Sequence, residues 1–384
     1  MRVLVVSIPA IGHLYPLVPL AWAFRAAGHD VLLATAEHVE HAERTGLRVA
    51  DIAPGYDTPT VMGRALAENP DLARMFRSGP MRAELTDWAP QFAAVNRPLL
   101  PGVLELADSW RPDLVVYDHA ATCGLIAADR LGVPAVQQVL GVFSTGSLHV
   151  ATTELLARTC PELGLRTPAD PAVVLEYMPP SMLTRAPEGW FSRFVPYTGG
   201  GRSAPVPAHH EGRPRIAVTL GTIAPQRQGL GQLEPLIAAA AEIDVELVLA
   251  LGDVDPGPLG VLPPNVRSVG WEPLDALLDT CAAVVHHGGA STMMTAISHG
   301  LPQLVVLSPH DPIRPLMGEA VSSRGVGVVA SPDEVTAKTI HRLLTDEALH
   351  EATAEVDAEN RALPSPAATA ARIRDTIGHL TPAR

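Results

Sequence analysis

Two adjacent histidines precede two glycines at residues 286–289, and a helical pattern follows them. Histidine pairs can bind metals, whereas glycines before a helix are typical of phosphate sites, because they admit a ligand to the backbone where the helix dipole favours negative charge. Neighbouring strand residues point to opposite faces, so His286 and His287 cannot both ligate one ion. The pattern favours a diphosphate site over a metal site, and a plain glycine turn is locally at least as consistent with it.

The expected phosphate site would use backbone amides more than side chains. The helix begins near Ala290 or Ser291, so the unpaired amides of its first turn would face the loop of Gly288 and Gly289. His287 would add a side-chain donor. This arrangement needs no metal ion.

Three further strand ends carry residues suited to a nucleotide sugar. Trp271 and Pro273 lie on a loop, where the indole could stack on a nucleobase or pack in the core. Asp311 could accept hydrogen bonds from sugar hydroxyls or form an Asx turn before Pro312. The stretch TLGT, ending at Thr222, adds a glycine turn with a hydroxyl.

A histidine and an aspartate suggest acid–base chemistry in the first half of the chain. His13 lies in the loop after the first expected strand, and Asp118 ends the later run LVVYD. Histidine titrates near neutral pH and can act as a general base that a carboxylate orients. Both residues follow strand ends of one sheet, so they could meet; a capping or hydrogen-bonded loop histidine is the alternative.

Alternating strands and helices would position these residues. Apolar, β-branched runs predict buried strands, and helical patterns lie between them, which indicates parallel sheets. The expected strands are 2–8, 30–35, 112–118, 133–139, 215–221, 245–251, 282–285, which runs into a glycine turn at 286–289, and 303–308. The expected helices are 16–29, 120–132, 232–243, 291–300 and 365–380. Residues 53–100 mix turn signals with short helical stretches, and residues 141–195 are similarly irregular.

Composition limits the classes of function. The 384 residues are 47% hydrophobic and 18% charged, with a net charge of −13, which supports large cores and argues against a nucleic-acid surface. The N-terminal stretch is apolar but broken by prolines and lacks a cleavage site, so neither a membrane helix nor a signal peptide is expected. The three cysteines are widely spaced. We expect a cytoplasmic protein without disulfides.

The order and spacing of these motifs resemble the nucleotide-sugar glycosyltransferases of the GT-B fold, nearest to bacterial natural-product enzymes related to the plant transferases. The resemblance is carried by GHLYPLVPLAWAFRAAGHDV, PDLVVYD, VTLGT and above all the block at residues 269–312. It implies two Rossmann-like parallel-sheet domains facing across a cleft. The expected boundaries are 1–200 for the acceptor domain, 201–214 for a Gly/Pro-rich linker, 215–365 for the donor domain and 366–384 for a helix packing back on the first domain.

The resemblance also implies roles for single residues. His13 would deprotonate the acceptor and Asp118 would stabilise the imidazolium. Trp271 and Pro273 would pack around the base of the donor, and Asp311 would contact sugar hydroxyls. The residues expected at the diphosphate are Thr222, His287, Gly288, Gly289, Ala290, Ser291 and Thr292.

The sequence departs from the family pattern after Asp311, where Pro312 stands in place of the usual glutamine. A hydrogen-bonding side chain to the sugar is therefore missing, which favours a dTDP-activated 6-deoxyhexose over UDP-glucose. The expected reaction is inverting, metal-independent transfer of a (deoxy)hexose to a polyketide-type aglycone in antibiotic biosynthesis, without a cofactor.

Two functions other than glycosyl transfer are also compatible with the sequence. A nucleotide-sugar 2-epimerase shares the fold and phosphate site but should show acidic groups facing the sugar. An auxiliary binding protein that has lost catalysis is disfavoured by His13, Asp118 and Asp311. The expected partners are the nucleotide sugar and the aglycone, not nucleic acid or membrane; a homodimer and a helper protein are both compatible with the sequence.

Overall fold

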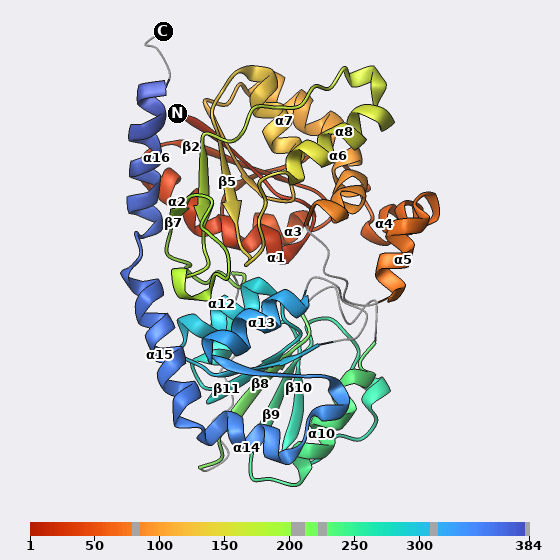
Figure 1. Cartoon of the computed structure of the whole chain (residues 1–384), viewed down its shortest axis with the longest axis vertical. Coiled ribbons are helices and arrows are strands. Elements are labelled where there is room, and N and C mark those ends of the chain that lie inside the picture. Colours follow the sequence, from red (N-terminus) through yellow and green to blue (C-terminus); the bar gives the residue numbers. More distant parts are fainter. Residues whose placement is uncertain (79–84, 201–211, 222–228, 308–313, 381–384) are drawn as a thin grey trace. The chain divides into compact units, whose positions relative to one another are not determined.

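The computed structural model describes residues 1–78, 85–200, 212–221, 229–307 and 314–380, and the chain forms two compact units (Figure 1). Unit 1 contains Met1–Pro180, Arg185–Arg193 and Leu363–Arg384; unit 2 contains Ser181–Thr184 and Phe194–Ala362. No helix among the described residues is long and apolar enough to cross a membrane.

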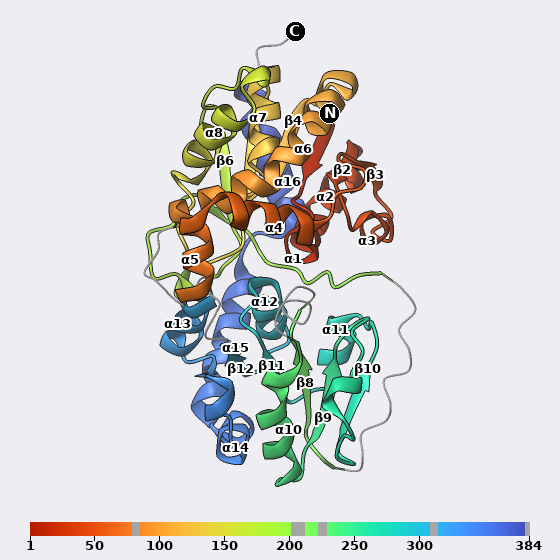
Figure 2. The same cartoon turned by 90° about the vertical axis from the view of Figure 1, so that its right-hand side faces the viewer.

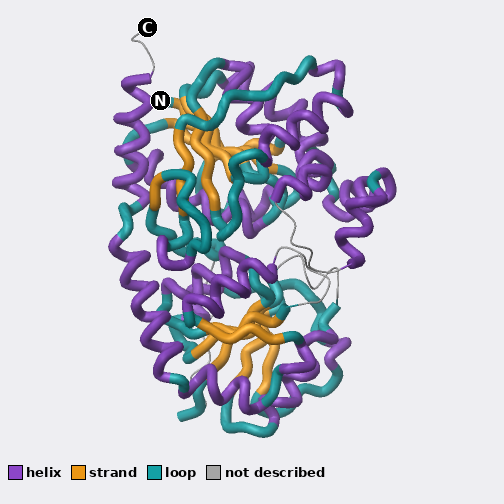
Figure 3. Tube along the Cα trace, viewed as in Figure 1, coloured by secondary structure: helices purple, strands orange, loops and turns teal. Residues whose placement is uncertain are grey.

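Unit 1 is built on a seven-stranded parallel sheet in the order β3-β2-β1-β4-β5-β6-β7. Its strands are β1 (Arg2–Val6), β2 (Asp30–Thr35), β3 (Arg48–Asp51), β4 (Leu114–Asp118), β5 (Ala135–Val139), β6 (Val173–Glu176) and β7 (Trp190–Phe191). Its helices are α1 (Ile11–Leu14), α2 (Val18–Ala26), α3 (Val39–Glu43), α4 (Thr58–Glu68), α5 (Pro70–Ser78), α6 (Ala89–Trp110), α7 (Thr122–Leu131), α8 (Leu148–Thr159) and α16 (Pro366–Leu380). Figure 3 shows helices flanking the strands.

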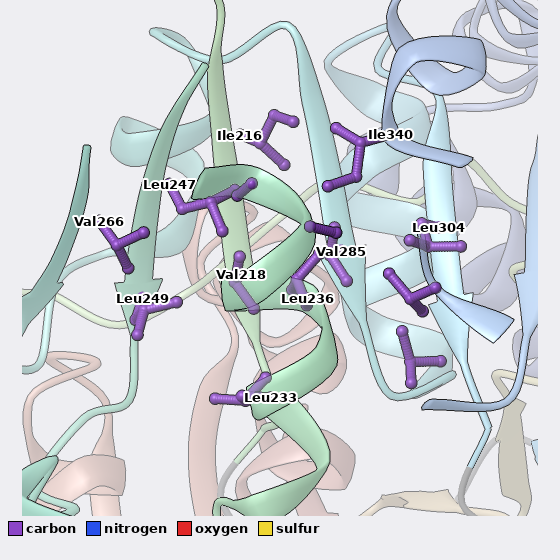
Figure 4. Packing of buried hydrophobic residues seen from close by; sticks show 14 of the residues in the cluster. Ile216, Val218, Leu233, Leu236, Leu247, Leu249, Val266, Val285, Leu304 and Ile340 are labelled. Atoms are coloured by element: carbon purple, nitrogen blue, oxygen red, sulfur yellow. The ribbon is translucent and has the colours of Figure 1, made fainter. Parts of the chain in front are cut away.

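Unit 2 is also built on a parallel sheet, with six strands in the order β10-β9-β8-β11-β12-β13. Its strands are β8 (Arg215–Thr219), β9 (Glu246–Ala250), β10 (Val266–Val269), β11 (Ala283–His286), β12 (Gln303–Val306) and β13 (Gly327–Ala330). Its helices are α10 (Glu234–Ala241), α11 (Leu274–Leu278), α12 (Ala290–Ser298), α13 (Arg314–Arg324), α14 (Ala337–Thr345) and α15 (Glu347–Ala362). Leu236 of α10 packs on Val218 and Val285 of the sheet in the apolar core (Figure 4).

Strand order reverses once in each unit. In unit 1 the chain runs from β1 outward through β2 and β3 and then returns to β4 beside β1; in unit 2 it runs from β8 through β9 and β10 and returns to β11 beside β8. Ligands of open α/β sheets bind at such reversals, outside the carboxyl ends of the strands. The loops after β1, β4, β8 and β11 are therefore the places to look for chemistry.

The terminal helix α16 belongs to unit 1. It packs against α2, as the two views of the chain show (Figure 2). The Arg372 guanidinium carbon lies 3.7 Å from the centroid of the Trp190 ring, and the hydroxyls of Ser192 and Thr369 are 2.8 Å apart. These contacts attach the end of the chain to the edge of the first sheet.

The predicted α/β class with two parallel sheets is confirmed, and α4 and α5 are short helices of the kind expected before residue 100, but a long helix in that region was not expected. Residues 89–110 form one helix, α6, despite Pro98 and Pro101 inside it. The buried Asn96 side chain secures this helix, since its Nδ2 donates to the carbonyls of Phe92 and Ala120 at 2.8 and 2.7 Å. Tertiary contacts here override the helix-breaking tendency of proline.

We predict opposite effects for two glycine-to-alanine changes within helices. A Cβ at Gly102 of α6 would overlap with the carbonyl oxygen of Ile52, whereas a Cβ at Gly63 of α4 meets open space. Gly102→Ala should lower the free energy of unfolding by about 1–3 kcal/mol through overpacking. Gly63→Ala should raise it by about 0.5–1 kcal/mol through helix propensity. Urea denaturation measures both, and stabilisation by Gly102→Ala would contradict the packing described.

Candidate active site

His13 and Asp118 meet at the strand reversal of unit 1. His13 lies in α1, after β1, and Asp118 is the last residue of β4, the neighbour of β1. The His13 Nδ1 atom lies 2.9 Å from Asp118 Oδ1. The backbone amides of Ala120 and Ile8 also donate to the carboxylate, each at 2.9 Å. The expected contact between the two side chains is present.

Asp118 keeps its negative charge although it is buried. Burial alone would raise the pKa of Asp118, but the charge interaction and hydrogen bond with His13 outweigh it and hold the pKa below its usual value. A carboxylate only accepts hydrogen bonds, so His13 Nδ1 donates and Nε2 carries the lone pair. The His13 side chain is 31% exposed, so a ligand can reach it.

A second imidazole beside this pair escaped the sequence interpretation. The His119 ring lies 5.4 Å from the His13 ring and 5.2 Å from the Phe143 ring, centroid to centroid. Burial lowers the pKa of His119 to about 4, so it is neutral at neutral pH. One ligand atom each of His13, Asp118 and His119 lies within 4.8 Å of the others. The only sequence signal was the position of His119 directly after Asp118.

Glu188 anchors the loop that carries Phe143. Its carboxylate accepts hydrogen bonds from the Thr145 amide and hydroxyl at 2.9 and 2.7 Å, from the Gly146 amide at 3.2 Å and from the Ser144 hydroxyl. The backbone amide of Glu188 in turn donates to Glu176. The sequence offered no sign of this anchor, because the partners stand 42 to 44 residues apart.

The two histidines of unit 2 have different environments. His286 is fully buried: its Nε2 lies 2.7 Å from Gln303 Oε1, and its Nδ1 accepts the Gly288 amide at 3.1 Å. Burial lowers the pKa of His286 to about 4. A neutral ring with Nε2 protonated satisfies both contacts. His286 therefore holds the turn at Gly288, where φ is +88°.

His287 lies between two glycines of neighbouring loops. A Cβ at Gly221, after β8, would lie 2.6 Å from His287 Cε1, and one at Gly289 would lie 2.9 Å from Nε2. Burial holds the pKa of His287 well below its usual value, and the positive charge of Arg314 lowers it further. Its buried Nδ1 has no hydrogen-bond partner within the described part of the chain. The Thr219 backbone lies beside the ring and acts to raise the pKa of His287.

The start of α12 supplies backbone donors beside His287. Gly289 is the N-cap residue and provides no side-chain cap, and the first intrahelical bond runs from Met293 to the Gly289 carbonyl. The amides of Ala290, Ser291 and Thr292 precede that bond, so they are the groups that a helix leaves for an external acceptor. Phosphate is the common occupant of such a position.

Trp271 lies at the same edge of the sheet, after β10. The half-buried indole packs over Gly252, where a Cβ would lie 3.3 Å from Trp271 Cε3. Pro273 is the N-cap residue of α11. Thr222, Asp311 and Pro312 lie outside the described residues. The donor-binding roles of Trp271, Pro273, Thr222 and Asp311 stay predictions, as do those of His287 and of residues 288–292.

Comparison with known proteins gives the family. Models described as the N-terminal and C-terminal domains of erythromycin biosynthesis protein CIII-like proteins match residues 22–221 and 234–375. Elloramycin glycosyltransferase ElmGT of Streptomyces olivaceus is 39% identical over 98% of both chains. The chain belongs to the erythromycin biosynthesis protein CIII-like family. It is therefore a bacterial natural-product glycosyltransferase, as the motifs predicted.

Solved structures agree with this assignment. The glycosyltransferase SnogD from Streptomyces nogalater is 35% identical, with a TM-score of 0.83 over 98% of this chain and 99% of SnogD. SsfS6 of Streptomyces sp. SF2575, in complex with thymidine diphosphate, is 29% identical, with a TM-score of 0.82 over 98% of this chain and 99% of SsfS6. Enzymes of the family are sugar transferases of antibiotic pathways, and the GT-B fold is confirmed.

The buried neutral histidines predict a loss of stability in mild acid. The unfolded chain binds protons at the ordinary imidazole pKa of about 6.5, whereas native His286 binds one only near 4. Stability from this group is thus complete above the unfolded pKa and declines as pH falls toward 4. His286→Gln should show a smaller fall in Tm between pH 7 and pH 5 than the wild type. Equal falls in Tm would show that His286 does not contribute.

Proposed function

We propose that the protein transfers a 6-deoxyhexose from a dTDP-activated donor to a hydroxyl of a polyketide-type acceptor, with inversion and without a metal ion. The observation that carries the proposal is the His13–Asp118 hydrogen bond at the strand reversal of unit 1. It fixes the proton on Nδ1 of a side chain that is 31% exposed and, in the neutral ring, leaves the lone pair on Nε2. That is the geometry of a general base.

The reaction would be a single displacement. His13 Nε2 removes the proton of the acceptor hydroxyl as its oxygen bonds to the anomeric carbon. The bond from that carbon to the diphosphate breaks, and its electron pair leaves with the diphosphate. Attack opposite the leaving group inverts the anomeric configuration. Asp118 stabilises the imidazolium formed, because its own pKa keeps it ionised.

Charge on the departing diphosphate would be stabilised without a cation. The amides at the start of α12 point to that role, and a His287 ring protonated on Nδ1 can donate to a phosphate oxygen. Gly221 and Gly289 support the proposal because only glycines leave room for the ring. The thymidine diphosphate complex of SsfS6 supports dTDP as the carrier, and Pro312 supports a sugar with fewer hydroxyls.

Nucleotide binding can be tested without an acceptor. dTDP at 100 times its Kd should stabilise the native protein by about 2.7 kcal/mol, seen as a rise in Tm, since it binds only the folded state. Gly289→Ala should abolish most of that shift, because the added Cβ displaces His287. Gly231→Ala, whose Cβ makes only an ordinary contact, is the matched control. Absence of any shift in the wild type would contradict a dTDP site.

Catalysis by His13 can be tested by substitution. His13→Ala should lower kcat for O-glycosylation by about tenfold or more, with the dTDP-induced Tm shift unchanged, because general base catalysis typically contributes about 10²–10⁴-fold. Asp118→Asn should also lower kcat, since it removes the charge opposite the imidazolium. EDTA should leave turnover unchanged.

Three results would contradict this assignment. Unchanged turnover in His13→Ala would remove His13 from the mechanism. Loss of turnover in EDTA would require a metal ion. Conversion of the nucleotide sugar into its 2-epimer, without transfer to an acceptor, would favour the epimerase alternative.

A further inference from the structure

His119 is a buried imidazole for which the base mechanism has no use. Only 6% of its surface is exposed. Burial lowers the pKa of His119 to about 4 and keeps the ring neutral, while the Gln138 backbone acts to raise this pKa, which is the effect of a carbonyl that accepts the ring N–H. A neutral imidazole that donates once has one nitrogen left, and that nitrogen can only accept.

The neighbours of His119 include both residues of the proposed base pair. One ring nitrogen of His119 is within 4.8 Å of a ring nitrogen of His13 and of a carboxylate oxygen of Asp118. The three adjacent strands β1, β4 and β5 end in loops that carry His13, His119 and Phe143 in that order. The row of rings therefore extends from the proposed base along the edge of the sheet.

Phe143 is the third ring of this row, and its position depends on the glycine at residue 141. A Cβ at Gly141 would overlap with the Phe143 ring, so glycine is required for the ring to lie there. Glu188 holds the following residues through Thr145 and Gly146. Phe143 stays half-buried and offers an aromatic surface next to His119. A flat, apolar acceptor fits this surface.

We propose that His119 is a specificity-determining residue that accepts a hydrogen bond from a second hydroxyl of the acceptor, on the carbon next to the reacting hydroxyl. The inference rests on the proposed function, since it takes His13 as the group that binds the reacting hydroxyl. The acceptor class is therefore a planar vicinal diol of the catechol kind. A carbonyl or methoxy group in the second position cannot donate and would leave His119 unpaired.

Three coloured anthraquinones test this by equilibrium binding, which needs no turnover. They are 2,3-dihydroxyanthraquinone, 2-hydroxyanthraquinone and 2-hydroxy-3-methoxyanthraquinone, titrated into the full-length protein with dTDP present. The wild type should bind the diol about tenfold more tightly than either of the others, the usual cost of leaving one polar group unpaired. In His119→Phe the preference should fall to about twofold, the statistical advantage of two equivalent hydroxyls.

Two further variants separate the hydrogen bond from a general effect on structure. His119→Gln, whose amide oxygen also accepts, should restore part of the diol preference. His149→Phe removes another buried histidine of unit 1, one paired with Asp170 at 3.2 Å, and should keep the full preference. The dTDP-induced Tm shift should be the same in all variants.

The outcomes distinguish this inference from the proposed function. Equal affinity of the wild type for the three compounds, or an unchanged preference in His119→Phe, would overturn the role of His119. Loss of the preference in EDTA with His119 intact would assign the cluster to a metal ion and overturn it as well. A diol preference that depends on His119, in a protein that forms no glycoside from a dTDP-deoxysugar, would support this inference and contradict the proposed function.

Discussion

The hydrogen bond between Asp118 and His13 is the interaction on which the chemistry of unit 1 depends. A carboxylate that is almost fully buried would become neutral without compensation, and three donors from separate segments keep it ionised: the His13 ring and the amides of Ile8 and Ala120. The Ala120 amide follows Asp118 along the chain, whereas the Ile8 amide and the His13 ring reach the carboxylate because β1 and β4 are neighbours at the strand reversal. The fold thus determines both the charge of Asp118 and the tautomer of His13.

Unit 2 uses a buried histidine for a different purpose. His286 is satisfied on both ring nitrogens and fixes the turn at Gly288, while His287 has a buried nitrogen without a partner in the described residues. One residue of the pair shapes the loop, and the other is the one that we propose to contact the diphosphate. Glycine at 221 and 289 is a steric requirement of that second ring, not only a source of backbone freedom.

The sequence predicted what depends on local pattern and missed what depends on distant contacts. Strand β2 begins and ends at the residues expected, since a continuous apolar run follows the turn at Gly28. Helix α6 was missed because Pro98 and Pro101 argue against a helix, and only Asn96 and the packing of Gly102 explain it. His13 and Asp118 were paired correctly from strand ends, but the ring of His119 could not be placed without the loop of Phe143.

Inverting transfer in a single displacement requires a base on one face of the sugar and the diphosphate on the other. The most direct test is the anomeric configuration of the glycoside, determined by the one-bond and three-bond NMR couplings of its anomeric proton. A dTDP-sugar of known configuration should give a product of the opposite configuration. A product that retains the donor configuration would contradict His13 as the base of a single displacement.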